Sequence, residues 1–152
     1  MIDIAQAWHA LRQVPDPEIP VLSITDLGIV REVRANGGAI DVVVTPTYSG
    51  CPATAEIHRS IEEALLKAGA TRVRIDVRLA PAWTTDWITE EAKVRLRAYG
   101  VAAPVRFMPR ALECPRCASR DTERLSEFGA TPCKAIWRCR ACREPFEYFK
   151  PL

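Results

Sequence analysis

Histidine is scarce in this chain, and long apolar runs are absent. His9 and His58 are the only histidines among 152 residues, and neither lies in a motif that pairs a base with a nucleophile, which argues against a thiol hydrolase. No apolar run approaches the roughly 20 residues that span a bilayer, so a membrane span is excluded. The N-terminal stretch MIDIAQAWHALRQV lacks the basic start and continuous apolar core of a signal peptide. We therefore expect a cytoplasmic protein.

The chain also lacks a strong charge of one sign. Its formal net charge is +2, with 11 Lys and Arg against 13 Asp and Glu up to residue 100, and 10 against 6 beyond it. The basic excess therefore lies in the C-terminal tail, where four thiolates around a Zn²⁺ ion would cancel about half of it. The tail has no basic stripe interleaved with stacking aromatic residues. A nucleic-acid partner is not expected.

What the chain does have is cysteine, six in all. In a reducing compartment, cysteines indicate metal or thiol chemistry more than disulfides. CPRC and CRAC are two C-x2-C motifs separated by 21 residues, a spacing typical of zinc ribbons. We predict a structural Zn²⁺ site, and neighbouring arginines would offset its negative charge. An iron site with the same ligands is the alternative. The predicted ligands are Cys114, Cys117, Cys139 and Cys142, and the neighbouring arginines include Arg138 and Arg140.

Cys133 is a further thiol in the tail, six residues before the second C-x2-C motif. Free cysteine is among the most buried side chains, so we expect Cys133 to be a small buried residue. Its use as a replacement metal ligand is the alternative, although two C-x2-C motifs already supply four sulfurs.

The spacing of apolar residues predicts an α+β fold in which a small sheet is packed with helices in the order αββαβα. Prolines at 104 and 109 mark a linker before a zinc ribbon. The predicted domains are an α+β domain over 1–100, a linker over 101–112 and the ribbon over 113–152. The predicted helices cover 4–14, about 52–68, and a third segment capped by Thr84, Thr85 and Asp86 and ended by Gly100, and the predicted strands cover 29–34, 39–46 and 72–79.

The strand at 72–79 has the clearest pattern in the chain. In RVRIDVRL, apolar residues alternate with arginine and aspartate. Such alternation predicts a sheet that is packed on one face and wet on the other. The residues at 35–38, which include two glycines, predict a hairpin between the strands expected at 29–34 and 39–46.

Cys51 lies where a strand-like run gives way to a helix-like one. Gly50 precedes it and Pro52 follows, which predicts Cys51 at the N-cap and Pro52 at the first helical position. Unpaired backbone N–H groups and the helix dipole would favour the thiolate there. Cys51 is therefore expected to be an accessible nucleophile or metal ligand, and the alternative is a cysteine that merely replaces a serine cap.

Several motifs together resemble the MIP18 family, also called the domain of unknown function 59 family. They are DPEIP, DLG, TYSGCP and the helix that follows, and the resemblance covers roughly residues 1–100. The WTTDW segment, the CPRC and CRAC motifs and EPFEYFK look like the PaaD (PaaJ) branch of that family. The resemblance implies a cytoplasmic accessory protein of the multicomponent phenylacetyl-CoA epoxidase, whose partners are a di-iron oxygenase subunit and a flavin/iron–sulfur reductase subunit.

The resemblance also implies a role and a set of residues. The family takes part in iron–sulfur cluster assembly, so the implied role is assembly or delivery of a transient iron–sulfur cluster or iron, without turnover of substrate. Its cysteine corresponds to Cys51, its DPE motif includes Asp16 and Glu18, and its threonine corresponds to Thr47. One cysteine cannot complete four-thiolate ligation, so a homodimer, Cys133 or oxygen ligands would have to contribute.

A different class of function is a structural adaptor. In that hypothesis the zinc ribbon and the aromatic FEYF segment dock a partner, and Cys51 is inert. The two hypotheses differ in whether replacing Cys51 abolishes activity without changing assembly.

Overall fold

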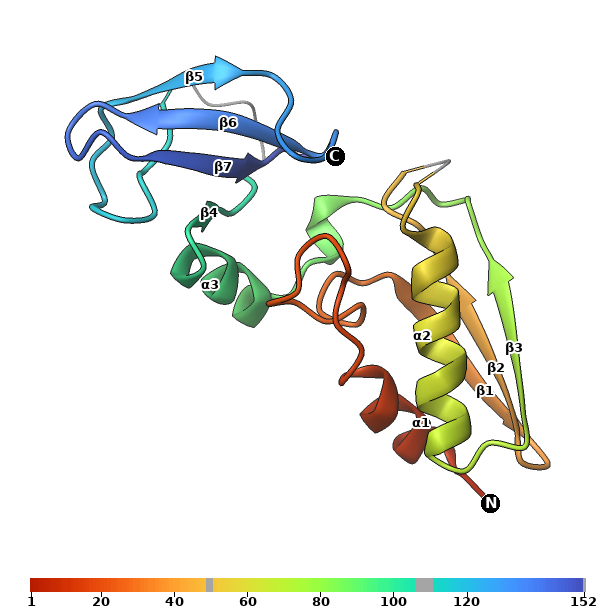
Figure 1. The fold of residues 1–152 in the computed structure, drawn as a ribbon. Coiled ribbons are helices and arrows are strands. Elements are labelled where there is room, and N and C mark those ends of the chain that lie inside the picture. Colours follow the sequence, from red (N-terminus) through yellow and green to blue (C-terminus); the bar gives the residue numbers. More distant parts are fainter. Residues whose placement is uncertain (49–50, 106–110, 152) are drawn as a thin grey trace. The chain divides into compact units, whose positions relative to one another are not determined.

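The computed structural model describes residues 1–48, 51–105 and 111–151. The chain forms two compact units, Met1–Thr89 and Glu90–Leu152, each with its own sheet (Figure 1). The linker pattern placed a division after residue 100. Helix α3 (Glu90–Ala98) instead contacts strand β4 (Val101–Ala102) and groups with the second unit.

The first unit is a three-stranded sheet in the order β1 (Val30–Asn36), β2 (Ala39–Val44) and β3 (Arg72–Val77). Strands β1 and β2 are antiparallel, whereas β3 is parallel to β2. The parallel connection is made by helix α2 (Thr54–Lys67), which contacts β3 and helix α1 (Ile4–Leu11). The predicted α+β class and the order αββαβα are confirmed.

The hairpin between β1 and β2 forms as predicted. Asn36 pairs with Ala39, so the loop consists of Gly37 and Gly38 alone. Their φ angles are 59° and 90°, which is the left-handed pair that a type I′ turn requires. The turn fixes the register of the hairpin.

Two helix ends differ from the prediction. Helix α1 ends at Leu11 rather than at Val14. Helix α2 begins at Thr54 with Ala53 at the N-cap, so the prediction of Cys51 as the N-cap is wrong. The reason is a turn before the helix, in which the Thr54 N–H donates to the Cys51 carbonyl over 3.2 Å. Pro52 lies in that turn and not in the helix.

The predicted caps of the third helix form a separate 3₁₀ turn, η1 (Thr85–Trp87). The Thr84 hydroxyl accepts from the Asp86 N–H at 3.3 Å, and α3 starts only at Glu90. The indole of Trp83 donates to the Leu27 carbonyl over 2.8 Å. The segment is therefore held by the loop that precedes β1, and it does not extend a helix.

Strand β3 is less covered than its alternation predicted. Val73 and Ile75 are half-buried, but Val77 is 47% exposed and Leu79 is 58% exposed. The physical reason is position, because β3 is an edge strand of its sheet. The apolar row is real, and only part of it is packed.

The second unit is a four-stranded sheet in the order β4, β7 (Pro145–Phe149), β6 (Lys134–Cys139) and β5 (Thr122–Ser126). Its core includes Trp137 and Tyr148, whose rings meet edge to face at 6.2 Å. The aromatic side chains of the FEYF segment are at most 4% exposed, so the expectation that they dock a partner is wrong. They are Phe146, Tyr148 and Phe149.

Within the described ranges, no helix combines the length and apolarity needed to cross a membrane.

Candidate functional site

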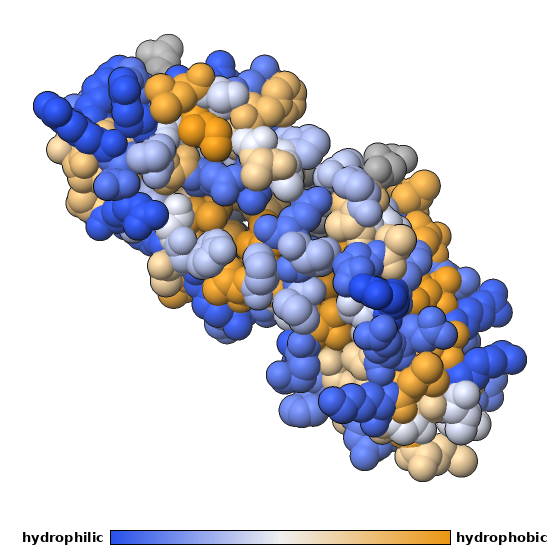
Figure 2. Space-filling model, viewed as in Figure 1, coloured by the Kyte–Doolittle hydropathy of each residue, from blue (hydrophilic) through white to orange (hydrophobic). Residues whose placement is uncertain are grey.

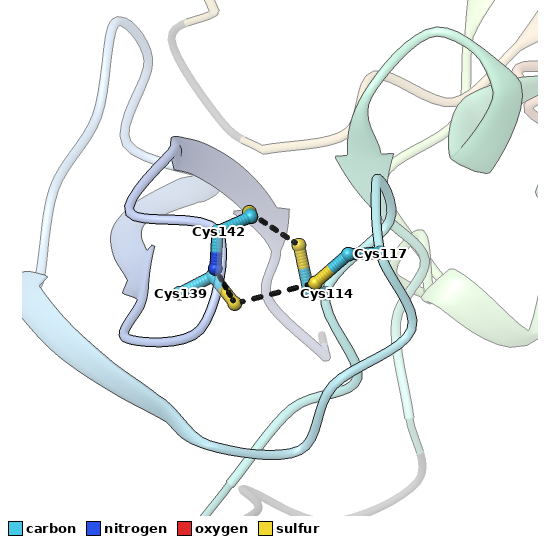
Figure 3. A group of neighbouring side chains, drawn as sticks. All are labelled: Cys114, Cys117, Cys139 and Cys142. Carbon is cyan, nitrogen blue, oxygen red and sulfur yellow. Dashed lines mark hydrogen bonds between the residues drawn. The ribbon is translucent and has the colours of Figure 1, made fainter.

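The four predicted metal ligands come together in the second unit (Figure 3). The Sγ atoms of Cys114 and Cys142 are 3.8 Å apart, those of Cys117 and Cys139 are 3.6 Å apart, and all four lie within 4.8 Å of one another. A disulfide has sulfurs about 2.05 Å apart. A tetrahedron with metal–sulfur distances of about 2.3 Å has edges of about 3.8 Å. The four thiols therefore fit one tetrahedrally coordinated metal ion.

The two C-x2-C loops share one backbone design. In the first loop the Arg116 N–H donates to Cys114 Sγ at 3.4 Å, and in the second the Cys142 N–H donates to Cys139 Sγ at 3.5 Å. The residue after each second cysteine, Ala118 or Arg143, has a φ of 64°. That left-handed conformation is unfavourable for residues other than glycine. Both loops thus combine an N–H group aimed at the first sulfur with one residue in an unfavourable backbone conformation.

These N–H groups change the acidity of the thiols. The backbone N–H of Cys142, and after it that of Ala141, lower the pKa of the Cys139 thiol to about 7 against the effect of burial. At Cys142, the backbone N–H of Glu144 lowers the pKa, but burial and the neighbouring thiols outweigh it and raise the pKa to about 11. Four crowded thiols cannot all ionise alone, whereas a bound cation removes that repulsion.

The arginines beside the ligands have other partners. Arg138 pairs with Glu123, while Arg140 pairs with Glu123 at 2.8 Å and with Asp121 at 3.2 Å. The expectation that these two guanidinium groups mainly offset the sulfur charge is therefore not supported by the contacts. The pairing of β5 with β6 is responsible, because it sets Glu123 opposite Arg138.

Cys133 does not belong to the sulfur cluster. It is 5% exposed, and its Sγ lies 2.9 Å from the Thr131 hydroxyl. The group of close metal-ligating atoms within the described residues contains the four other tail cysteines and not Cys133. Its burial agrees with the interpretation as a small core residue.

Cys51 is the one cysteine of the first unit. Its side chain is 8% exposed, so the expectation of an accessible thiol is wrong. It lies on the connection from β2 to α2, where its N–H donates to the Tyr48 carbonyl over 3.3 Å. Gly50, which was expected to let the chain turn there, lies outside the described residues.

Three connections leave the same end of the first sheet. Since β1 is antiparallel and β3 is parallel to β2, the start of β1 and the ends of β2 and β3 lie together. Backbone bonds extend this pairing, from Thr45 N–H to the Ile29 carbonyl and from Arg78 N–H to the Val44 carbonyl, each 2.8 Å. The loop with Asp16 and Glu18 and the loop with Thr47 and Cys51 therefore both begin or end here.

Asp16 has a clear local role in its loop. It is 5% exposed, and its Oδ2 accepts from the N–H groups of Glu18 at 3.0 Å and Ile19 at 2.8 Å. A carboxylate that bonds backbone N–H groups a few residues ahead stabilises a turn. Glu18 and Thr47 are half-buried. The DPE motif thus shapes the loop that leads from α1 into β1.

Two features of this end were not found from the sequence. Thr45 is 1% exposed, and its hydroxyl has no hydrogen-bond partner among the described residues. Gly28 of the DLG motif has a φ of 73°, and a Cβ there would lie 2.7 Å from Cβ of Trp87. The Trp87 ring also carries the Arg31 guanidinium, 3.6 Å from its centroid. For Thr45, the available sequence signal was a threonine directly after an apolar strand.

Two family descriptions match separate stretches of the chain. The description "iron-sulfur cluster assembly protein" matches residues 4–77, and "PaaD zinc beta ribbon domain" matches residues 104–150. The first includes the Cys51 end of the sheet, and the second includes the four-cysteine cluster.

Two relatives differ in how much of the chain they match. A protein of Escherichia coli (strain K12), provisionally named as one of the subunits of 1,2-phenylacetyl-CoA epoxidase, is 51% identical over 152 residues, covering 97% of this chain and 92% of that protein. An Fe-S protein maturation auxiliary factor of Porphyromonas gingivalis is 38% identical over 91 residues, covering 57% of this chain and 83% of that protein.

Two solved structures resemble part of the chain. The domain of unknown function DUF59 from Bacillus anthracis superposes with a TM-score of 0.57 at 25% identity, covering 60% of this chain and 89% of that one. A conserved hypothetical protein from Thermotoga maritima gives a TM-score of 0.54 at 26% identity, covering 62% and 94%.

Proposed function

Because the chain belongs to the PaaD branch of the iron–sulfur cluster assembly (domain of unknown function 59) family, we propose that it is an accessory protein of the phenylacetyl-CoA epoxidase system. In this role it assembles or delivers an iron–sulfur cluster or iron to the reductase or oxygenase subunit in the cytoplasm. It does not itself turn over substrate.

One observation carries the proposal. Cys51 is the single cysteine of the stretch matched to the family, and its loop leaves the sheet at the end where the loop that carries the DPE motif enters β1. The thiol of Cys51 would be the first ligand of the cargo. Carboxylate oxygens of Asp16 and Glu18, or the hydroxyl of Thr47, would complete the coordination.

Such a ligand set suits cargo that must leave again. A single thiolate with oxygen donors holds iron less firmly than four thiolates do, because soft sulfur ligands favour iron–sulfur centres over hard oxygen ligands. The acceptor subunit can then offer a better set of ligands. The buried hydroxyl of Thr45, without a partner among the described residues, adds a donor that bound cargo could satisfy.

The ribbon has a different role in this proposal. It holds a resident Zn²⁺ through Cys114, Cys117, Cys139 and Cys142, which stabilises the second unit. The zinc takes no part in delivery. This assignment is supported by the fit of the four sulfurs to a closed tetrahedral site.

The test is the iron content of the partners. Cells that carry Cys51→Ala should fail to epoxidise phenylacetyl-CoA, and the reductase or oxygenase purified from them should be deficient in iron. Cys133→Ala is the matched control, because it also removes one buried thiol and should leave the iron content of both partners normal.

The adaptor hypothesis predicts the opposite pattern. Cys51→Ala cells would then grow normally on phenylacetate, and variants of the ribbon would fail through loss of assembly. Full iron occupancy of both partners from Cys51→Ala cells would refute delivery through this thiol.

A further inference from the structure

Strand β3 presents an unpaired edge to its surroundings. It is one of the two edge strands of the first sheet and lies beside α2 (Figure 1). The Arg78 N–H donates to β2, and the backbone groups of alternate residues in a strand point to opposite edges. The N–H and C=O groups of Val73, Ile75 and Val77 therefore point outward. Within the described residues no strand pairs with them.

The same edge carries apolar side chains that the unit does not cover. Val77 is 47% exposed and Leu79 is 58% exposed, and hydrophobic residues reach the surface on this side of the unit (Figure 2). An exposed edge with an apolar row is a template for another strand. The edge also carries three arginines, Arg72, Arg74 and Arg78, whose charges disfavour pairing with unrelated strands.

We propose that the occupant of this edge is β3 of a second copy of the chain, paired antiparallel with Ile75 opposite Ile75. A two-fold axis makes such an interface self-complementary. Val73 then faces Val77 of the second copy, which covers the exposed valine. The outward backbone groups supply about six interchain hydrogen bonds.

Charge complementarity selects this register. Arg74 comes opposite Asp76 of the second copy, and the pair occurs twice because of the symmetry. Within one chain, Arg74 and Asp76 form an ion pair with an N–O distance of 3.4 Å. Both side chains can turn toward the second copy, because they are 64% and 52% exposed. They occupy non-hydrogen-bonded positions, where facing side chains approach most closely.

Neighbouring registers are worse. A shift that centres the pair on residue 74 sets two arginines on the axis, and a shift to residue 76 sets two aspartates there. Like charges directly opposite each other destabilise a strand pair. In the proposed register Arg72 faces Arg78, but Arg78 is already bound to Glu32 at 3.2 Å.

The dimer has a consequence for the metal cargo. Antiparallel strands put the two Cys51 loops at opposite ends of the joined sheet, so two copies of Cys51 cannot share one cluster. Each chain would therefore carry its own cargo site. The dimer itself depends on β3 alone and does not require the delivery function.

The test compares three full-length, zinc-loaded proteins by sedimentation equilibrium. The wild type should form dimers in a concentration-dependent manner. Asp76→Arg should weaken dimerisation about tenfold, because it replaces two attractive pairs with two repulsive ones. The double variant Arg74→Asp/Asp76→Arg should restore it, since it only exchanges the two charges.

The double variant also checks the register, because a pair centred on residue 74 would not be rescued by it. Both variants should fold, because the substituted side chains are exposed. Circular dichroism checks this. A wild type that is monomeric at every concentration, a dimer indifferent to Asp76→Arg, or a double variant as weak as the single one would each overturn the proposal.

Discussion

The sulfur cluster of the ribbon and the Cys51 end of the first sheet are two contrasting ways of presenting thiols to metal. The ribbon holds four Sγ atoms within 4.8 Å of one another, with backbone N–H groups aimed at two of them. The first unit offers one thiol, 8% exposed, on a loop that leaves the sheet at the end where the loop with Asp16 and Glu18 enters β1. A complete donor set retains its metal, whereas an incomplete set can give it up.

The two units also differ in what stabilises them. The first has two helices packed on a sheet, with many buried apolar residues. The ribbon buries fewer large side chains, and two of the residues in its core, Cys114 and Cys139, belong to the four-cysteine cluster. We therefore expect metal to be part of the fold in one unit and cargo in the other.

The largest expected effect comes from breaking the ribbon's donor set. Cys117→Ser should unfold the second unit and leave the first folded, because a structural zinc contributes on the order of 10 kcal/mol to such a site. The indole NMR signals report on each unit separately. The signal of Trp137 should collapse, while those of Trp8, Trp83 and Trp87 persist. An unchanged Trp137 signal in a zinc-free variant would contradict this account.

The next effect concerns the first unit alone. Gly28→Ala should lower its free energy of unfolding by about 2–4 kcal/mol, because it adds an unfavourable φ and an overpacked Cβ. That Cβ would lie 2.7 Å from Trp87 Cβ and 2.8 Å from its carbonyl oxygen. Chemical denaturation followed by tryptophan fluorescence measures the loss.

Gly37→Ala is the matched control for this change. Gly37 has a similar φ of 59°, but a Cβ there would meet nothing within 4 Å. Its cost should therefore be limited to the backbone, about 1–2 kcal/mol. Equal losses for the two variants would show that the contact with Trp87 is not what requires glycine at position 28.

Much of this architecture could be predicted from local sequence. The Gly37–Gly38 turn and the two C-x2-C motifs have short-range causes, and the structure agrees with both. The start of α2 could not be predicted, because Pro52 fits a turn as well as a first helical position. The exposure of Val77 depends on β3 being an edge strand, which its alternation cannot reveal.

The candidate site divides in the same way. The four-cysteine cluster follows from spacing alone, since C-x2-C loops are local structures. The Asp16 loop and the Cys51 loop lie at one end of the sheet because β1 is antiparallel to β2 and Thr45 bonds to Ile29, a contact between residues far apart in the chain. The left-handed conformation of Ala118 could not be predicted from the sequence, because glycine is the residue that usually indicates this conformation.

A smaller, stabilising effect is expected at those left-handed positions. Ala118→Gly and Arg143→Gly should each stabilise the metal-loaded ribbon by about 1 kcal/mol, because glycine adopts a φ of 64° without steric cost. The melting temperature of the second unit should rise in both variants. A fall in either would mean that the side chain contributes more than the strain costs.

The smallest effect lies on the surface of the ribbon. Arg140 and then Arg138 lower the pKa of Glu123 below its usual value of 4.5, so its ion pairs stabilise the ribbon above that pH and lose their effect as the pH falls through the lowered pKa. Glu123→Gln should slightly lower the melting temperature at neutral pH and make no difference in strong acid. A pH-independent difference would point to packing and not to charge.

The most direct test of the contrast is the metal content after anaerobic reconstitution with iron and sulfide. We predict that wild type and Cys51→Ala retain equal amounts of zinc and that only the wild type gains iron. This iron should leave the protein when metal-free reductase or oxygenase is added. If Cys51→Ala binds as much iron as wild type, or if iron enters only by displacing the ribbon's zinc, the cargo is not held by Cys51 and the account is wrong.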